Sequence, residues 1–345
     1  MQKSQFVNLK HMDYTTLMTQ LEIDAQKQNI PFKGEFELTS FCNLKCPFCY
    51  VSNNLQHSLA KHISTNEWLR IIEEAVNAGM MRVNFTGGEV FVREDFEEIY
   101  SKTYDMGVKI LILTNGTLIG DRQIDFLKKR TPESISMTLY GASAETYKKL
   151  TGITNSFELA MKAIERMIKA GLPLSLKTVA IPDILNEMNS IKSLAEKYKL
   201  RINLVKYFSD IRESYSIDKL SWRLQPSKIQ KIDFGFHNSN KLDNTERKLG
   251  ICNCAKGRFA ITHDGKLLGC LSYTEIYTNP FTDGFCNALE KLRKLINEKE
   301  KKCSDCVNCA HIKECSKCMG LNYAETGAIS KCNQYRKDLA KYCFI

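Results

Sequence analysis

Three cysteines near the start of the chain carry the clearest chemical signal. Cys42, Cys46 and Cys49 are spaced C-x3-C-x2-C in the segment CNLKCPFCY and are followed directly by Tyr50. Thiolates on one short loop suit an iron–sulfur cluster, because each cysteine binds one iron. Three cysteines for the four irons of a [4Fe–4S] cluster leave one iron free to bind another molecule.

Two simpler interpretations compete with a cluster. A structural zinc site usually takes thiolates in pairs and fills four positions, whereas this loop offers three, and His57 and His62 downstream lack finger spacing. Buried unligated cysteines would need a regular strand or helix, but Asn43, Lys45 and Pro47 interrupt both periodicities. The loop is therefore predicted to hold a metal cluster.

A second group of cysteines fills the C-terminal part of the chain. Of the 14 cysteines, 11 fall within residues 251–345, namely Cys252, Cys254, Cys270, Cys286, Cys303, Cys306, Cys309, Cys315, Cys318, Cys332 and Cys343. A long chain without an export signal favours metal binding over disulfides. Because C-x2-C pairs recur here, zinc ribbons are one alternative. The segment CAKGRFAITHDGKLLGC predicts a β-hairpin with Asp264 and Gly265 at its turn, which would hold two of the cysteines at a fixed separation.

Apolar segments alternate with helical patterns from Glu35 onward. The predicted strands are 36–38, 81–85, 110–113, 135–139, 174–179 and 202–205. The helix signals are two capping boxes, Ser64 with Glu67 and Asn155 with Glu158, and two terminating glycines, Gly79 and Gly171. This order predicts an α/β fold with a parallel sheet curved into a partial barrel, whose site lies at the carboxyl ends of the strands. Residues 1–34 are predicted to form a helical lead-in, with Leu17, Leu21 and Ile23 as apolar contacts and Pro31 as its stop.

Polar residues follow the predicted strands where such a site would lie. Gly87 and Gly88 let the backbone approach a ligand closely, and Glu89 beside them accepts hydrogen bonds from an ammonium group. The ends of the third, fourth and fifth strands add Thr114, Asn115, Ser136 and Lys177. Each of these four residues has a plainer role as a strand-end group that satisfies the backbone.

The nonapeptide CNLKCPFCY, with its aromatic residue after the third cysteine, resembles the signature of radical S-adenosylmethionine (radical SAM) enzymes. The segment Gly87-Gly88-Glu89 resembles the family's GGE motif. The resemblance implies a partial (β/α)6 barrel and a free iron chelated by the methionine part of SAM. It also implies that the GGE backbone binds SAM's amino group and that Tyr50 lies near the adenine. Thr114, Asn115, Ser136 and Lys177 then become candidates for the ribose and carboxylate of SAM.

The C-terminal cysteines resemble the SPASM extension of radical SAM enzymes that modify peptides. Cys254, Gly265 and Cys270 match its first part, Cys306, Cys309 and Cys315 its second, and Cys332 its last, while Cys318 comes one residue early. The resemblance implies two auxiliary [4Fe–4S] clusters. One would be held by Cys252 or Cys254 with Cys270 and Cys318, and the other by Cys306, Cys309, Cys315 and Cys332. Cys286, Cys303 and Cys343 are left over, and His311 is expected to be a loop residue.

The resemblance implies an enzyme that abstracts hydrogen from a ribosomally made peptide or protein and installs a thioether, a carbon–carbon crosslink or an oxidation. Its expected partners are a reductant such as flavodoxin or ferredoxin and, in one version, a separate peptide-recognition chain. A peptide epimerase is an alternative, with Cys286, Cys303 or Cys343 as hydrogen donor. Leu271, where sulfatase maturases have an aspartate, disfavours formylglycine formation. Haem or quinone-cofactor biosynthesis and a zinc-stabilised binding protein remain the small-molecule and non-enzyme alternatives.

Composition limits the remaining possibilities. The 345 residues are 43% hydrophobic and 26% charged, as in an ordinary globular protein. No long apolar run or signal-peptide core is present, so we expect a cytoplasmic protein that does not bind membranes. The charge of +10 lies on segments such as KLRKLINEKEKK without interleaved aromatics, which predicts a solvated face rather than nucleic-acid binding and leaves an acidic peptide partner open.

The expected division is a lead-in at 1–34, a barrel at 35–225, a bridge at 226–250 and a SPASM domain at 251–345. Around the bridge, five residues either contact substrate or pack against the next domain. They are Tyr207, Arg212, Tyr215, Trp222 and Arg223.

Overall fold

The computed structural model describes residues 13–51, 63–206, 221–230, 232, 254–300, 305, 309–311, 315 and 318–342. Within these ranges the strands form one sheet in the order β6-β5-β4-β3-β2-β1-β7-β8. The strands are β1 (Lys33–Glu37), β2 (Arg82–Thr86), β3 (Lys109–Thr114), β4 (Ser134–Thr138), β5 (Leu174–Val179), β6 (Ile202–Val205), β7 (Arg258–Ile261) and β8 (Leu267–Leu268).

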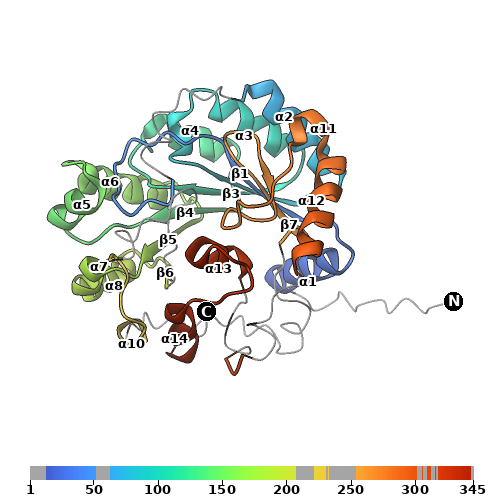
Figure 1. Ribbon diagram of the computed structural model, residues 1–345. Coiled ribbons are helices and arrows are strands. Elements are labelled where there is room, and N and C mark those ends of the chain that lie inside the picture. Colours follow the sequence, from blue (N-terminus) through green and yellow to red (C-terminus); the bar gives the residue numbers. More distant parts are fainter. Residues whose placement is uncertain are drawn as a thin grey trace.

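Helices connect and cover these strands (Figure 1). The first part of the chain contains α1 (Tyr14–Lys27), α2 (Thr65–Asn77), the 3-10 helix η3 (Val90–Val92), α3 (Phe96–Asp105), α4 (Asp121–Lys129), α5 (Ala144–Thr151), α6 (Ser156–Lys169), α7 (Pro182–Asn186) and α8 (Met188–Lys197). The later part contains α10 (Pro226–Ile229), α11 (Pro280–Asp283), α12 (Phe285–Glu300), α13 (Met319–Thr326) and α14 (Gln334–Tyr342).

The strands β1 to β6 are parallel throughout, which confirms the predicted open parallel sheet. The predicted hairpin is also present, because β7 and β8 pair antiparallel and Gly265 takes a positive φ of 86° at the turn. One pairing was not predicted: β7 lies parallel to β1, with Phe36 opposite Ile261. The hairpin therefore extends the sheet beyond β1 and places its turn, residues 262–266, at the end of the sheet where the cysteine loop begins, whereas Cys254 lies before the amino end of β7.

The two faces of the sheet differ in polarity because side chains alternate along each strand. Residues such as Phe36, Phe85 and Ile135 face the helices and are 0% exposed. Strand register places Glu35 beside Asn84 and Thr138 beside Lys177 on the other, concave face. One face therefore makes the core with the helices, and the other presents polar groups to the interior of the partial barrel.

The helix boundaries follow the sequence signals with one exception. Ser64 and Glu67 form the predicted capping box, and Gly79 follows α2 with a φ of 108°. The box predicted at Asn155 is wrong, because Asn155 has φ −95° and ψ 9° and its side chain makes no cap bond. An N-cap side chain normally reaches back from extended backbone, and Glu158 instead pairs with Lys162.

The lead-in helix forms as expected, but its contacts differ from the prediction. Leu21 is 41% exposed, whereas Met18 and Ala25 are buried and pack with Phe32. The helix is oriented so that Glu22 pairs with Arg258 at the start of β7, and this leaves Leu21 at the edge of the buried stripe.

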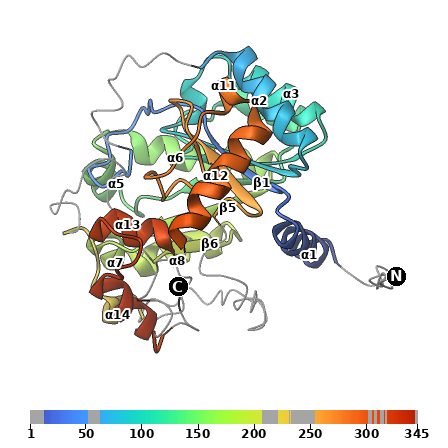
Figure 2. The ribbon, with the colours of Figure 1, turned by 45° about the vertical axis from the view of Figure 1, so that its right-hand side comes forward.

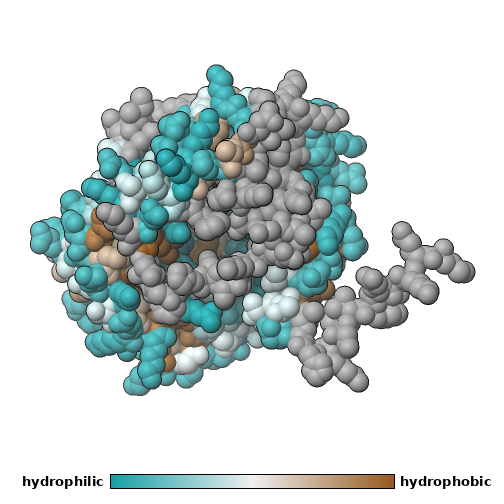
Figure 3. Space-filling model, turned by 90° about the horizontal axis from the view of Figure 1, so that it is seen from below, coloured by the Kyte–Doolittle hydropathy of each residue, from teal (hydrophilic) through white to brown (hydrophobic). Residues whose placement is uncertain are grey.

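The C-terminal helices lie on two sides of the sheet. Figures 1 and 2 both show α12 beside α2, and α13 and α14 on the side away from α2 and α3. Seen from below, the coloured residues in Figure 3 are mostly hydrophilic, with several hydrophobic patches among them. Among the described residues, no helix has both the length and the apolar character needed to span a bilayer.

Candidate functional site

The cysteine loop, residues 38–51, begins where β1 ends. It has no regular secondary structure, and two apolar side chains, Leu44 and Phe48, anchor it in the core with exposures of 2% and 6%. The backbone N–H of Lys45 donates to the carbonyl of Thr151 at the end of α5 over 2.7 Å. The segment CNLKCPFCY is therefore a loop that is held against the core by buried side chains and a backbone hydrogen bond.

The three thiols of this loop lie in a shielded environment. Burial raises the pKa of Cys42 to about 12 and raises that of Cys46 as well, so both would be neutral thiols until a metal's positive charge removes their protons. Each of the two is also within electrostatic range of Cys49. In the described part of the chain, no three His, Cys, Asp or Glu side chains converge on a single metal ion.

The glycine pair is in direct contact with the start of the cysteine loop. Gly88 N–H donates to the Thr39 carbonyl and Glu89 N–H to the Phe41 carbonyl, both over 2.8 Å. Gly87 has a φ of 154°, which favours glycine, and a methyl group at Gly88 would stand 2.7 Å from the Ser40 carbonyl oxygen. The N–H groups of Gly88 and Glu89 therefore hold the turn against the cysteine loop, and the predicted contact of this turn with a ligand's ammonium stays a prediction.

The carboxylate of Glu89 is turned into the protein. It is 0% exposed and accepts hydrogen bonds from Thr114 Oγ1 over 2.8 Å, from Asn115 N–H over 2.7 Å and from Phe91 N–H over 3.3 Å. Burial raises the pKa of Glu89, and these three donors act against that rise. The structure thus shows Glu89 joining the ends of β2 and β3, and its predicted contact with a ligand ammonium stays a prediction.

The side chain of Asn115 is also turned toward the cysteine loop. Its Nδ2 atom lies 3.7 Å from Cys42 Sγ and 3.0 Å from Asn43 Oδ1. Its Oδ1 atom accepts from the backbone N–H and the hydroxyl of Thr117. Asn43 and Thr117 carried no chemical motif, so sequence reasoning missed them.

The other predicted SAM contacts lie on or near the concave face. Ser136 is half-buried in β4, and Tyr50 is half-buried directly after Cys49. Lys177 reaches from β5 toward Glu35 and Glu89. Burial lowers the pKa of Lys177, while the attraction of these two carboxylates opposes that change. A mostly shielded ammonium of this kind is suited to pairing with an anionic group of a ligand.

A buried contact between a histidine and a glutamate at the same edge was not predicted. His263 Nδ1 lies 3.4 Å from Glu37 Oε2, with side-chain exposures of 11% and 0%. Glu37 is the last residue of β1, and His263 follows β7, so the unexpected β1–β7 pairing creates this contact. The sequence signal that could have revealed this contact is the pair of acidic residues, Glu35 and Glu37, at alternate positions of a largely buried strand.

The described C-terminal cysteines gather in two places. Cys254 is buried against the strand end that carries Gly269 and Cys270, and Gly320 in α13 packs on Ser272. This brings Cys254 and Cys270 near the start of α13, where Cys318 is the N-cap residue. Cys332 is within electrostatic range of Cys309 and Cys315, and Arg336 lies beside Cys315 and Cys318. Cys252, Cys303, Cys306 and Cys343 lie outside the described residues.

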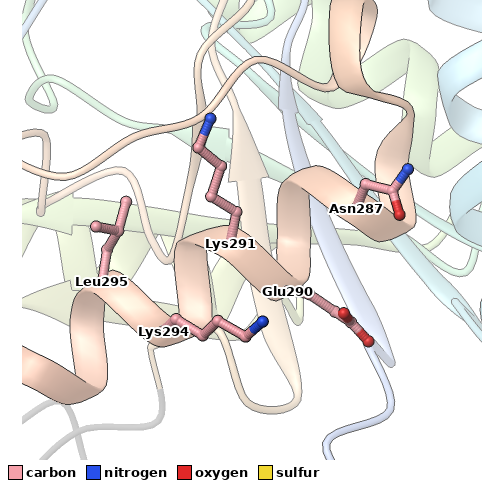
Figure 4. A pocket seen from close by; sticks show the side chains of 5 residues that line it. All are labelled: Asn287, Glu290, Lys291, Lys294 and Leu295. Atoms are coloured by element: carbon pink, nitrogen blue, oxygen red, sulfur yellow. The ribbon is translucent and has the colours of Figure 1, made fainter.

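Cys286, one of the leftover thiols, is exposed on α12. The neighbouring N–H of Phe285 donates to Glu74 of α2 over 2.7 Å, which places Cys286 on the outer helix layer and away from the concave face. The outer surface of α12 also has a shallow hollow, shown in Figure 4, where the side chains project from one helix into solvent. It is lined by Asn287, Glu290, Lys291, Lys294 and Leu295.

The described part of the bridge connects the cysteine loop to the C-terminal helices. Trp222 packs on Phe48 with ring centroids 5.6 Å apart. The guanidinium of Arg223 binds both oxygens of Glu325 in α13, at 3.1 and 2.5 Å, with side-chain exposures of 6% and 5%. Of the two alternatives given for Arg223, contact with substrate or packing against the next domain, the structure shows the packing. Tyr207, Arg212 and Tyr215 lie outside the described residues.

Comparisons with known proteins agree with this arrangement. Residues 36–195 match the family described as the radical SAM superfamily. The AdoMet-dependent heme synthase of Methanosarcina barkeri is 26% identical over 331 residues, which cover 87% of this chain and 94% of that protein. The PqqA peptide cyclase of Granulibacter bethesdensis is 33% identical over 144 residues, which cover 41% of this chain and only 38% of that protein.

A solved structure shares the fold over most of the chain. Streptococcus suis SuiB bound to precursor peptide SuiA matches with a TM-score of 0.65 and 17% identity, covering 97% of this chain and 84% of that one. The matched domain contains the cysteine loop, the glycine pair and the polar strand ends described above. Residues 36–195 thus form a radical SAM domain, and the chain is a radical SAM enzyme.

Proposed function

We propose that this enzyme removes a hydrogen atom from a peptide or protein and thereby installs a crosslink or an oxidised group. The observation that carries the proposal is the direct bonding between the cysteine loop and the glycine pair at the carboxyl edge of the sheet, next to the polar concave face. When bound, a [4Fe–4S] cluster would supply the electron that cleaves SAM to a 5′-deoxyadenosyl radical.

The chain's own residues have separate roles in this proposal. Cys42, Cys46 and Cys49 would hold the cluster. The carbonyls of the glycine pair would accept from the ammonium of SAM, and Lys177 would pair with its carboxylate. Tyr50, Thr114 and Ser136 are the remaining candidates for contact with the adenine and ribose. The helices and the C-terminal part would keep water from the concave face, where a carbon radical must survive.

Two observations support a peptide or protein as substrate. Over 144 residues the chain is 33% identical to a PqqA peptide cyclase, and the SuiB fold, solved with a precursor peptide, covers nearly all of it. Two auxiliary clusters belong to the proposal. The cysteines described together in the structure support one at Cys254, Cys270 and Cys318, with Cys252 as an alternative ligand, and one at Cys309, Cys315 and Cys332 with Cys306. A flavodoxin or ferredoxin would supply electrons. The cytoplasmic location and the domain boundaries stay predictions.

A small-molecule reaction is the second candidate. The match to the AdoMet-dependent heme synthase extends over 94% of that protein, more than the match to the peptide cyclase. An enzyme that acts on a tetrapyrrole would use the same cysteine loop and glycine pair to cleave SAM. The two candidates would differ only in the molecule that binds at the concave face and gives up a hydrogen atom.

The first experiment measures SAM cleavage by the full-length chain after anaerobic reconstitution and reduction. We expect 5′-deoxyadenosine and methionine from the wild type, about a dozen irons per chain, and no cleavage by the variant with Cys42, Cys46 and Cys49 changed to Ala. Equal cleavage by both proteins would contradict the proposal.

The second experiment identifies the substrate. Peptides encoded beside the gene and a tetrapyrrole are supplied with deuterium at carbon, and deuterium is measured in the 5′-deoxyadenosine formed. Transfer from a peptide supports the first candidate. Transfer from the tetrapyrrole alone supports the second and contradicts the first.

A further inference from the structure

Every hydrogen-bonding position on the Asn115 side chain is already occupied. A carboxamide offers two N–H donors and two acceptor positions. Asn115 gives its donors to Asn43 Oδ1 and Cys42 Sγ, at 3.0 and 3.7 Å. Its oxygen accepts from Thr117 N–H at 2.9 Å and from the Thr117 hydroxyl at 2.6 Å. The side chain is 5% exposed, so it has no free group for a ligand unless these bonds break.

The orientation of this amide is fixed by its neighbours. The backbone N–H of Thr117 can only donate, so the oxygen of Asn115 must face it and the NH₂ group must face Cys42. Asn43 Nδ2 donates to the Thr117 hydroxyl over 2.7 Å and closes a ring of three side chains. A flipped amide would put donor against donor at Thr117.

We propose that Asn115 is a positioning residue for the cluster and not a contact for SAM. This inference rests on the proposed function, because it requires a cluster on Cys42. A donor directed at a ligating sulfur stabilises the more negative, reduced state, and hydrogen bonds to the sulfurs are one determinant of cluster potential. The Leu44 backbone N–H donates to the same sulfur at 3.4 Å, so Asn115 supplies the donor that a substitution can remove.

The backbone of Asn115 connects the same residue to the glycine turn. Its N–H donates to Glu89 Oε2 over 2.7 Å, and Glu89 follows the glycine pair. A side-chain substitution leaves this backbone bond in place. The effects on the cluster and on the SAM turn can therefore be measured separately.

The experiment uses the full-length reconstituted protein with Asn115→Ala and Asn115→Asp. The aspartate keeps an oxygen for Thr117 but has no N–H for Cys42. The matched control is Asn84→Ala, since Asn84 is also 5% exposed but bonds Glu35 on the concave face of β2. Two quantities are measured: the midpoint potential of the SAM-responsive EPR signal, and the dissociation constant of SAM.

We expect both Asn115 variants to make reduction about tenfold less favourable, which for a one-electron couple is about 59 mV toward negative potential. The SAM dissociation constant should stay within about twofold, and the control should keep the wild-type potential. An unchanged potential in iron-replete variants overturns the inference, and an unchanged potential with about tenfold weaker SAM binding assigns Asn115 to SAM instead.

A further variant covers the case in which the Asn115 variants fail to load iron. Thr117→Val keeps the amide and the backbone N–H that orients it but removes the hydroxyl that bonds both Asn115 and Asn43; the ring of side chains then loosens, and the potential should shift in the same direction by a smaller amount. An unchanged potential in this variant also overturns the inference. Failure of the proposed function would appear separately, as a wild-type protein without SAM cleavage or a SAM-responsive signal.

Discussion

Replacing Gly88 by Ala tests whether the contact between the glycine turn and the cysteine loop is required for chemistry. The added methyl would stand 2.5 Å from the carbonyl carbon of Phe41 and 2.7 Å from the oxygen of Ser40. Carbon contacts are comfortable at about 3.5 Å, so the turn and the loop must separate by about 1 Å. The bonds from Gly88 to Thr39 and from Glu89 to Phe41 would be stretched or lost.

The size of the effect follows from these contacts. Overpacking costs about 1–3 kcal/mol, and two weakened hydrogen bonds cost about 0.5–1.5 kcal/mol each. The local penalty is therefore about 2–6 kcal/mol. Because a misplacement of about 1 Å lowers rates about 100-fold, we expect the rate of SAM cleavage per reconstituted cluster to fall by about that factor.

The assay is formation of 5′-deoxyadenosine by reduced protein, normalised to iron content. Gly107→Ala is the matched control, because Gly107 also needs a positive φ, 81°, but its added methyl meets nothing within 4 Å. We expect the control to stay within about twofold of the wild type despite a strain of about 1–2 kcal/mol. A Gly88→Ala protein with full iron content and wild-type cleavage would refute the reasoning.

Three further predictions concern other parts of the structure. Lys177→Met removes the shielded ammonium of the concave face and should weaken SAM binding about tenfold or more in equilibrium dialysis; unchanged affinity would remove Lys177 from the site. Arg223→Met leaves Glu325 without its bidentate partner, which costs about 3–5 kcal/mol while the carboxylate is charged. Burial raises the pKa of Glu325 from 4.5 to about 8, so the neutral carboxyl stabilises the folded protein at low pH, and this stabilisation is lost as the pH rises through about 8. Above that pH the carboxylate is charged and needs Arg223 as its partner. Amide exchange in α13, relative to wild type, should accelerate more at pH 9 than at pH 6, and equal acceleration would contradict this. Cys270→Ala should lose about four irons per chain while Cys286→Ala loses none; equal iron contents would argue against a cluster at Cys270.

The sequence alone predicted the chemistry and determined most of the sheet. Three cysteines at fixed spacing within nine residues and a glycine pair after a strand are local patterns, and their residue types limit what they can bind. Six strand segments were found within a few residues of their bounds, because alternation of apolar and polar residues records the two faces of a strand. The hairpin was predicted for the same reason, since its turn residues are adjacent in the chain.

Only the tertiary structure decided which distant residues meet. Nothing in the segment RFAI records that β7 pairs with β1, and that pairing alone brings His263 to Glu37. The apolar pattern predicted Leu21 to be buried, but the packing of α1 leaves it exposed. The sequence spacing predicted a capping box at Asn155, but the backbone angles there do not allow the cap bond. Asn115 ended a strand as predicted, yet its orientation depends on Asn43 and Thr117. Local patterns record period and chemistry, whereas the partner of a buried polar group is set by whichever donors and acceptors folding brings within reach.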